Sequence, residues 1–358
     1  MLVIEKGELA PLPKTYHTVH NICAYLYDHL TEVIGNFYYL DMANTPFDPP
    51  LPEEAGNGEF DHLDYLAKNN RHYELEIVVT KHLVMSMIGD MANFLYESLR
   101  IAKSGKMSVA YALLRKPFTD QLLIFEQLLI DRKDFIDRFY HSGEPKQYDP
   151  SDRTIDKKAI VNKAVEMLNT IDLYNADLLY ELRFDRNSPA SINGITNQAL
   201  HIVTNDKGYP TQQRDLNFIF GAPDRVEDQW KHYYFVMPLL LSYVGEVVDR
   251  IVFTLIQDPD GRHELKALER MLAFAMVFHQ PNDQPTNNML RHIGKMIETV
   301  CPICQEKNRF SKAYLRTYFF EGEFYCKRCH NPMKLNEAAH LRLKNLFFKT
   351  VEEAALTT

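Results

Sequence analysis

The chain lacks a hydrophobic run long enough to cross a membrane. Its longest apolar stretch, Tyr233–Val244, has 12 residues and is followed by Glu246 and Asp249, whereas a membrane-spanning helix needs about 20 consecutive apolar residues. The stretch therefore predicts a helix buried in a protein core, and we expect the protein to make no contact with a membrane.

The chain also has few cysteines and lacks the pattern of a secretory leader. Its first residues, Met1-Leu-Val-Ile, are followed directly by Glu5 and Lys6, rather than showing a basic and then an apolar segment. Of the five cysteines, four form two Cys-x-x-Cys pairs and Cys23 stands alone. Paired and unpaired thiols of this kind fit a reducing compartment, where disulfides are rare. We therefore expect a cytoplasmic protein.

Internal repeats and low-complexity tracts are absent, and strand patterns are weak before residue 301. Hydrophobic residues make up 46% of the sequence, and in most of the chain they recur at helical spacing. We predict a mainly α fold, with a multi-helix globular body, a small C-terminal β-hairpin module and a last helix. The expected helices are Tyr16–Leu40, Arg71–Lys103, Met107–Asp131 interrupted at Pro117, Lys157–Thr170, Asp172–Phe184, Ala190–Val203, Glu227–Gln257 with a kink at Pro238, one ending near Phe278, Met289–Val300 and Leu335–Ala355.

Two polar segments rich in turn-forming residues suggest the domain organisation. They are Gly143–Asp152 and Gln280–Asn288, and their proline, glycine and asparagine content is typical of loops. We predict an N-terminal helical region over residues 1–142, a second helical region over residues 155–300 that packs on the first, and a C-terminal module with its helix over residues 301–358.

The net charge of −8 conceals an uneven distribution. Residues 301–350 contain ten Lys and Arg against four Glu, a balance of +6, whereas residues 1–300 contain 30 basic and 42 acidic residues, a balance of −12. A polyanionic partner is therefore expected at the C-terminal end of the chain. We expect the acidic helical body to mediate further contacts, including assembly into a homo-oligomer.

The strongest chemical signal is the pair of Cys-x-x-Cys motifs near the C-terminus. Cys301 and Cys304 are separated by 21 residues from Cys326 and Cys329. Each motif turns two thiolates toward one point, and four thiolates complete the tetrahedral site of a structural Zn²⁺. A redox dithiol or two disulfides are the alternatives. The segment resembles the zinc-ribbon module, and this resemblance implies a metal-held β-hairpin without implying a particular function.

Between the two motifs, the residues from Lys312 to Phe320 alternate with a period of two, which predicts a strand. One face of this strand would carry basic and aromatic side chains in turn, an arrangement that suits stacking on bases and contact with phosphates. The alternative is that the aromatic side chains pack on the protein's own helix. The predicted nucleic-acid-binding residues are Lys312, Tyr314, Arg316, Tyr318, Lys327 and Arg328.

Two sets of residues in the helical body are candidates for catalysis. If Ala190–Val203 is helical, Asn197 and His201 lie on one face, with Arg183 close in sequence. Such a group suits general acid–base catalysis or phosphate binding. The alternative is a solvated or capped helix face.

The second set is Arg225 and His232, which match the Arg-x4–6-His pattern of the HEPN ribonucleases. This resemblance implies an all-helical fold and a catalytic role for the two residues.

Our preferred prediction is a zinc-binding protein with a binding or regulatory role, whose C-terminal module contacts a nucleic acid or a protein. A helical enzyme acting on nucleic acid or nucleotides, and a purely structural or oligomer-forming ribbon, remain the alternatives.

Overall fold

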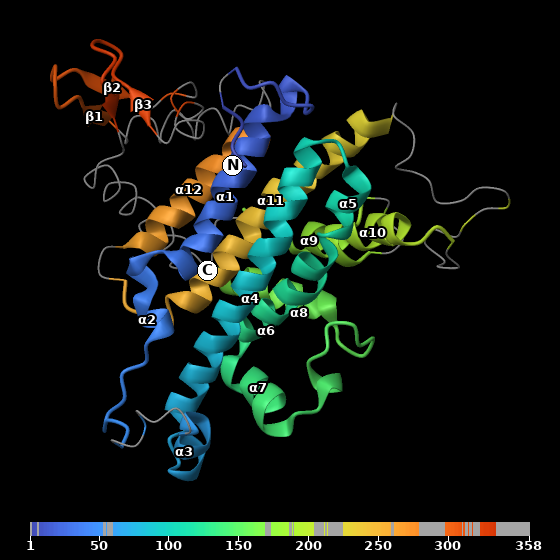
Figure 1. Ribbon diagram of the computed structural model, residues 1–358, viewed down its shortest axis with the longest axis vertical. Helices are drawn as coiled ribbons and strands as arrows, with labels where there is room; N and C mark the ends of the chain where they lie inside the picture. The colour runs from blue at the N-terminus through green and yellow to red at the C-terminus, as the bar shows by residue number, and fades with distance from the viewer. Residues whose placement is uncertain are drawn as a thin grey trace, which may run out of the picture.

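A computed structural model describes residues 2–5, 7–52, 55, 60–168, 173–185, 188, 190–203, 211, 213, 225–258, 261–278, 298–309, 311, 314, 317 and 323–333. The predicted mainly α body and the small C-terminal strand pairs are confirmed (Figure 1). The α-helices are α1 (His17–Gly35), α2 (Leu40–Ala43), α3 (His62–Lys68), α4 (His72–Lys103), α5 (Met107–Ala112), α6 (Leu122–Ile130), α7 (Arg132–Ile136), α8 (Lys157–Leu168), α9 (Ala176–Phe184), α10 (Ile192–Leu200), α11 (Val226–Val252) and α12 (Arg262–Phe278). Short 3₁₀ or π segments are η1 (Lys14–Tyr16), η2 (Phe37–Tyr39), η4 (Lys116–Gln121), η5 (Asp137–Ser142) and η6 (Pro145–Gln147). The strands are β1 (Glu298–Val300), β2 (Lys307–Arg309), β3 (Phe324–Tyr325) and β4 (Pro332–Met333).

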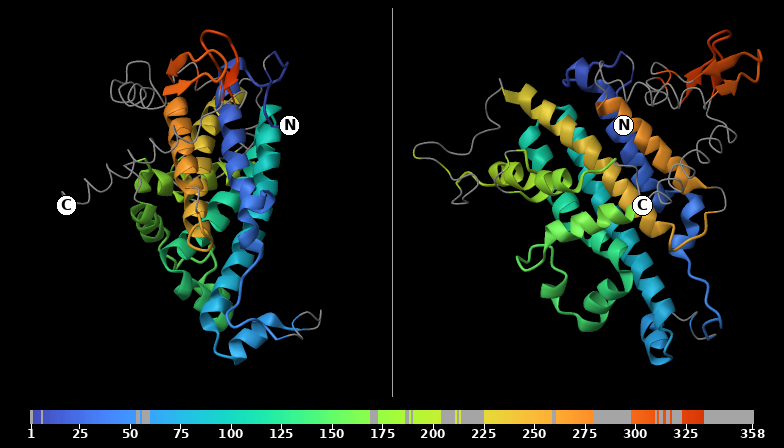
Figure 2. Two further views of the ribbon diagram at one scale, coloured as in Figure 1. Left: turned by 90° about the vertical axis from the view of Figure 1, so that its left-hand side faces the viewer. Right: turned by 180° about the vertical axis from the view of Figure 1, so that it is seen from behind.

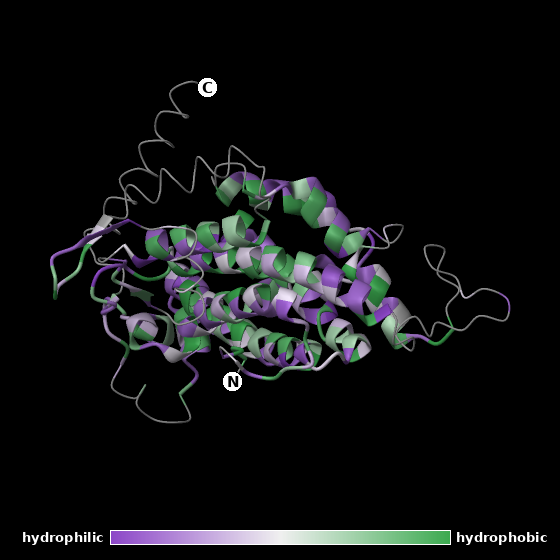
Figure 3. Ribbon diagram, turned by 90° about the horizontal axis from the view of Figure 1, so that it is seen from above, coloured by the Kyte–Doolittle hydropathy of each residue, from purple (hydrophilic) through white to green (hydrophobic). Residues whose placement is uncertain are grey.

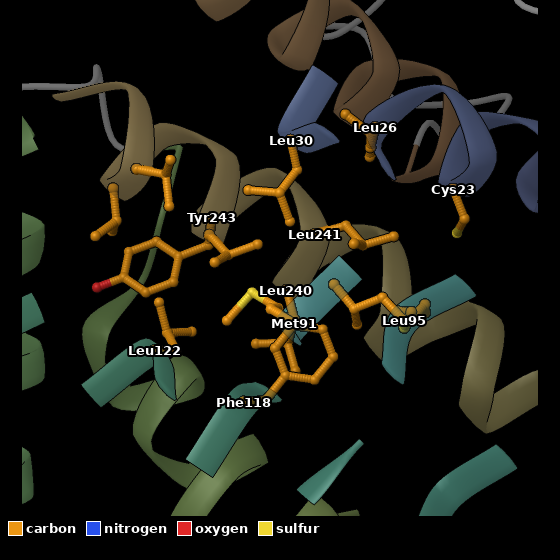
Figure 4. Packing of buried hydrophobic residues seen from close by; sticks show 14 of the residues in the cluster. Cys23, Leu26, Leu30, Met91, Leu95, Phe118, Leu122, Leu240, Leu241 and Tyr243 are labelled. Carbon is orange, nitrogen blue, oxygen red and sulfur yellow. The ribbon is translucent and has the colours of Figure 1, made fainter. Parts of the chain in front are cut away.

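Four long helices, α1, α4, α11 and α12, run side by side and form the body of the molecule (Figures 1 and 2). Hydrophilic and hydrophobic residues alternate along the helices of the body, a pattern typical of amphipathic helices (Figure 3). α1 packs on α4 and α11, and α11 also packs on α6 and α12. Residues 1–142 and residues 155–300 thus contribute to the same core. Buried side chains from α1, α4, α6 and α11 meet there, as Figure 4 shows for Cys23, Leu26, Leu30, Met91, Leu95, Leu122, Leu240 and Leu241.

The predicted interruption at Pro117 takes the form of a π-helical segment. Proline has no N–H to donate to the carbonyl four residues earlier, and its ring crowds that carbonyl. The chain accommodates it by widening to η4, and the N–H of Leu122 donates to the carbonyl of Pro117 at the end of this segment. The region expected to be one helix from Met107 to Asp131 is therefore divided into α5, η4 and α6.

α4 ends at a glycine whose conformation disfavours residues that carry a Cβ. Gly105 has φ +75°, a left-handed conformation that costs a residue with a Cβ roughly 1–2 kcal/mol. A Cβ at this position would also lie 3.2 Å from Cζ2 of Trp230, whose indole N–H donates to the carbonyl of Ala102 over 2.8 Å.

We expect Gly105→Ala to lower the free energy of unfolding by at least about 1 kcal/mol, because the backbone strain and the contact with Trp230 act together. Gly35→Ala is the matched control, since a Cβ there meets nothing within 4 Å and φ is not positive. Urea denaturation compares the two variants. Equal stability of both would show that the left-handed conformation of Gly105 is not required.

α12 is attached to α11 through buried charges as well as apolar contacts. The guanidinium of Arg270 donates to Glu246 over 2.7 and 3.0 Å and to Asp249 over 2.5 Å, and the ammonium of Lys266 lies 3.2 Å from Asp249. Burial alone would raise the pKa of Asp249, but the two cations beside it lower this pKa. Gly245 makes room for the network, because a Cβ there would lie 3.3 Å from Cδ of Arg270.

Candidate metal centre

Two short antiparallel hairpins carry the four clustered cysteines. β1 pairs with β2 and β3 pairs with β4, so that Val300 lies opposite Lys307 and Tyr325 lies opposite Pro332. Each hairpin encloses one Cys-x-x-Cys turn. The helix expected from Met289 to Val300 is wrong at its end, because residues 298–300 form β1; the remainder of that range lies outside the described residues.

The two hairpins have the same local geometry. In the first, the N–H of Cys301 donates to the carbonyl of Glu306 over 2.9 Å, and the N–H of Gln305 donates to the carbonyl of Cys301 over 3.0 Å. The residues 25 positions later make the same two bonds, each of 2.9 Å, and they are Cys326, Asn331 and His330. Gln305 and His330 also share a left-handed backbone, with φ +56° and +57°. Each Cys-x-x-Cys turn is thus closed by its own backbone.

The four sulfur atoms converge on one point between the hairpins. All lie within 4.8 Å of one another, and the pairs Cys301–Cys329 and Cys304–Cys326 are each 3.5 Å apart. Four sulfurs around a tetrahedral ion with metal–sulfur bonds of about 2.3 Å are about 3.8 Å apart. The predicted ligand set therefore forms a closed site that fits a metal ion. In the part of the chain that the structure describes, this is the one such cluster of ligand side chains.

Several N–H groups around Cys326 favour the thiolate form that a metal requires. Burial opposes ionisation of this thiol, but the backbone N–H groups of Cys329 and Arg328, the side-chain amide of Asn308 and the neighbouring Cys304 thiol lower its pKa. The Arg328 N–H lies 3.4 Å from the sulfur.

Asn308 is a residue of the site that sequence reasoning did not single out. It is fully buried between the two hairpins, whereas Lys307 and Arg309 on either side of it are exposed. Its amide donates to the carbonyl of Glu306 over 2.9 Å, and its carbonyl oxygen accepts the N–H of Lys327 over 2.8 Å. The available signal was the alternation of charged and uncharged residues in β2, which directs the uncharged side chain inward.

The predicted nucleic-acid-binding residues are only partly described. Lys312, Arg316 and Tyr318 lie outside the described residues.

Tyr314 and Thr317 are helical, so the strand expected over this stretch is wrong at both positions. The Tyr314 N–H donates to Oγ of Ser311 over 3.3 Å, and the Tyr314 ring packs against Phe324 with ring centroids 5.7 Å apart. Tyr314 is therefore a packing residue of the module.

Lys327 and Arg328 lie exposed on the second Cys-x-x-Cys turn. Lys327 forms an ion pair of 2.9 Å with Glu306, which raises its pKa, while the nearby Arg309 acts in the opposite direction. Lys327, and to a smaller extent Arg328, lowers the pKa of the Glu306 carboxyl group. We call Lys307, Arg309, Lys327 and Arg328 the basic cluster.

Of the candidates near α10, Asn197 and His201 meet at the end of the helix, where the His201 N–H donates to the Asn197 carbonyl over 2.9 Å, whereas Arg183 lies in the core. Arg183 is fully buried, and its guanidinium binds Glu126 through bonds of 2.5 and 2.9 Å and the carbonyl of Phe118 over 2.7 Å. α10 is shorter than expected and ends at Leu200, so His201 is an exposed, extended residue beyond it. Asn197 accepts a hydrogen bond of 3.4 Å from Arg115. Arg183 thus serves the core rather than a shared face with His201.

The second candidate pair lies at the start of α11. Arg225 precedes the helix and is exposed. Both ring nitrogens of His232 have protein partners, Tyr111 Oη at 2.7 Å and the carbonyl of Ala190 at 2.9 Å. Burial lowers the pKa of His232. Both nitrogens of the His232 imidazole therefore take part in hydrogen bonds within the helical body.

In comparisons with protein-family models, curated proteins and solved structures, nothing matches this chain. Within the described residues, no helix has both the length and the apolar character needed to cross a membrane. The four-cysteine site and the helical body are thus the features on which a functional assignment rests.

Proposed function

We propose that this chain is a cytoplasmic zinc-dependent binding protein, in which Cys301, Cys304, Cys326 and Cys329 hold a structural Zn²⁺ and the module they organise binds single-stranded nucleic acid. Four sulfurs around one point suit a closed structural site, whereas a catalytic zinc keeps one position open for water. The ion therefore supplies folding energy to two hairpins that are otherwise very short.

The observation that supports nucleic acid as the partner is the basic cluster. Its four cations come from β2 and from the second Cys-x-x-Cys turn, and the bond from the Lys327 N–H to Asn308 holds these two segments together. Glu306 is the carboxylate paired with Lys327. Because residues 1–300 carry a balance of −12, this basic end of the chain is where a polyanion meets least repulsion.

We expect single-stranded RNA to bind the zinc-loaded protein with an affinity that falls as salt rises. Each lost phosphate contact should reduce the slope of log K against log salt by about 0.7. Arg309→Gln and Arg328→Gln should each weaken binding several-fold and lower the slope by that amount. Fluorescence anisotropy over a salt series measures both quantities. The exposed Arg153 of the helical body supplies the matched control, Arg153→Gln, which should leave affinity and slope unchanged.

Electrophoresis of the same RNA gives a separate answer on catalysis. Intact RNA after incubation supports a binding protein. RNA cleavage that is abolished by His201→Ala or His232→Ala would replace this proposal with an enzyme in the helical body.

In the salt series, an unchanged slope of log K against log salt in both arginine variants would contradict the assignment of the basic cluster to phosphate binding.

A protein partner is the second candidate, because the first hairpin exposes two apolar side chains. Ile303 on its Cys-x-x-Cys turn is 69% exposed, and Val300 of β1 is 45% exposed. Exposed apolar side chains on a small rigid module are typical of protein contacts. Failure of RNA to bind at low salt would favour this candidate.

A further inference from the structure

The two hairpins share their backbone geometry but differ at one buried position. The seventh residue after the first cysteine of each motif is Asn308 in the first hairpin and Met333 in the second. Both are buried, with 0% and 5% of their surface exposed, and they meet across the module with Nδ2 of Asn308 lying 3.7 Å from Sδ of Met333. Equivalent buried positions of the two hairpins therefore carry a polar side chain in the first hairpin and an apolar one in the second.

This difference corresponds to a second one on the Cys-x-x-Cys turns. Asn308 accepts the backbone N–H of Lys327, the residue after the first cysteine of the second motif. The equivalent residue of the first motif is Pro302, which has no N–H. Met333 is the equivalent of Asn308 in the second hairpin, and the turn opposite that hairpin contains Pro302. Because Pro302 has no N–H, the side chain at position 333 does not need an oxygen to accept one. An asparagine is needed on one side alone.

The amide of Asn308 also faces the metal centre. Its Nδ2 lies 3.6 Å from Sγ of Cys326, in addition to its bond with the Glu306 carbonyl. A fully buried amide with partners in both hairpins is held in one orientation. An N–H directed at a thiolate stabilises its negative charge, and groups in this position around metal ligands are worth about 10–100-fold in metal affinity.

We infer that Asn308 is a positioning residue of the metal centre. Its amide N–H holds the Cys326 sulfur in its ligating position as a thiolate, and its carbonyl oxygen fixes the turn that carries Lys327 and Arg328. Metal binding is thereby coupled to the arrangement of the basic cluster. This inference rests on the proposed zinc site, since it assigns a role toward that ion.

Two variants separate the functions of the amide. Asn308→Leu keeps the branched shape and the number of heavy atoms but loses every hydrogen bond of the amide, whereas Asn308→Asp keeps an acceptor for the Lys327 N–H and loses the donor to the Glu306 carbonyl and to sulfur. We expect zinc affinity, measured by competition with a chromophoric chelator on the full-length protein, to fall about 10–100-fold in both variants.

Cobalt gives a readout that general destabilisation would not change. In the protein saturated with Co²⁺, loss of the N–H from the Cys326 sulfur should move the sulfur-to-cobalt charge-transfer absorption to lower energy in both variants. Asn21→Ala is the matched control, because Asn21 is also fully buried and its amide bridges two backbone groups of Ile4 in the helical body. This variant should lower the melting temperature of the body and leave zinc affinity and the cobalt spectrum unchanged.

The possible results are distinguishable. Wild-type affinity in both Asn308 variants, or a fall in affinity with an unshifted cobalt band in Asn308→Asp, would overturn the role of Asn308 while the four-cysteine site remained. Wild-type protein that holds neither zinc nor cobalt would instead contradict the proposed function, and this inference with it.

Discussion

Replacing Cys326 by serine should abolish stoichiometric zinc binding and unfold both hairpins. β3 and β4 have two residues each, and β1 and β2 have three, whereas an isolated two-stranded hairpin is at best marginally stable in water. A structural zinc contributes roughly 10–16 kcal/mol in comparable peptides. Because one ion joins the two hairpins, loss of one ligand in the second hairpin should release the first as well.

Zinc content by mass spectrometry and limited proteolysis of residues 298–333 check this expectation. The helical body should keep its circular dichroism, since its core is built from the long helices. Cys23→Ala is the control, because Cys23 is buried in α1 and belongs to that core; it should retain one zinc per chain. One equivalent of zinc in Cys326→Ser would show that the four sulfurs are not the ligands.

Arg183→Met should cost about 3–5 kcal/mol of folding free energy, the range measured when one partner of a buried ion pair is removed. Arg183 and Glu126 are both fully buried, and Glu126 also accepts the hydroxyl of Tyr243 over 2.8 Å. Without the guanidinium, the carboxyl group is left in the core with one hydroxyl as its partner. Urea denaturation monitored by circular dichroism measures the loss.

A double variant tests whether charge is the cause. Adding Glu126→Gln to Arg183→Met removes the unpaired charge and keeps an acceptor for Tyr243, so part of the lost stability should return. Lys68→Met is the surface control, because the Lys68–Asp64 pair is exposed and its loss should have no measurable effect. A double variant as unstable as Arg183→Met alone would point to lost packing of the arginine side chain instead.

The sequence was sufficient for the features that depend on neighbouring residues. The period of the apolar residues predicted α4 to within one residue of its start, and the Ser104-Gly105 pair predicted its end, where Gly105 takes the left-handed conformation. Pro117 predicted a break in a helix, although not that the chain would widen into a π segment. The spacing of the four cysteines predicted their convergence, because each Cys-x-x-Cys turn is closed by local backbone bonds.

Features that depend on distant partners were not predictable from sequence. Arg183 was grouped with His201 because the two are close in sequence, but its partner Glu126 lies 57 residues earlier in the chain. Asn308 looks like an ordinary strand residue until the second hairpin places the Lys327 N–H and the Cys326 sulfur beside it. The alternation around Tyr314 predicted a strand, but Tyr314 and Thr317 are helical, and the Tyr314 ring packs on Phe324, which lies ten residues later in the chain.

The self-closed Cys-x-x-Cys turns have a consequence for how a metal enters and leaves. Each hairpin offers a preformed two-sulfur chelate, and the 21 residues between Cys304 and Cys326 keep a detached hairpin near its partner at a high effective concentration. Cys301 and Cys326 are buried, whereas Cys329 is exposed. Exchange with an external thiol or chelator should therefore proceed stepwise, starting at Cys329 and passing through a state in which the first hairpin alone retains the ion.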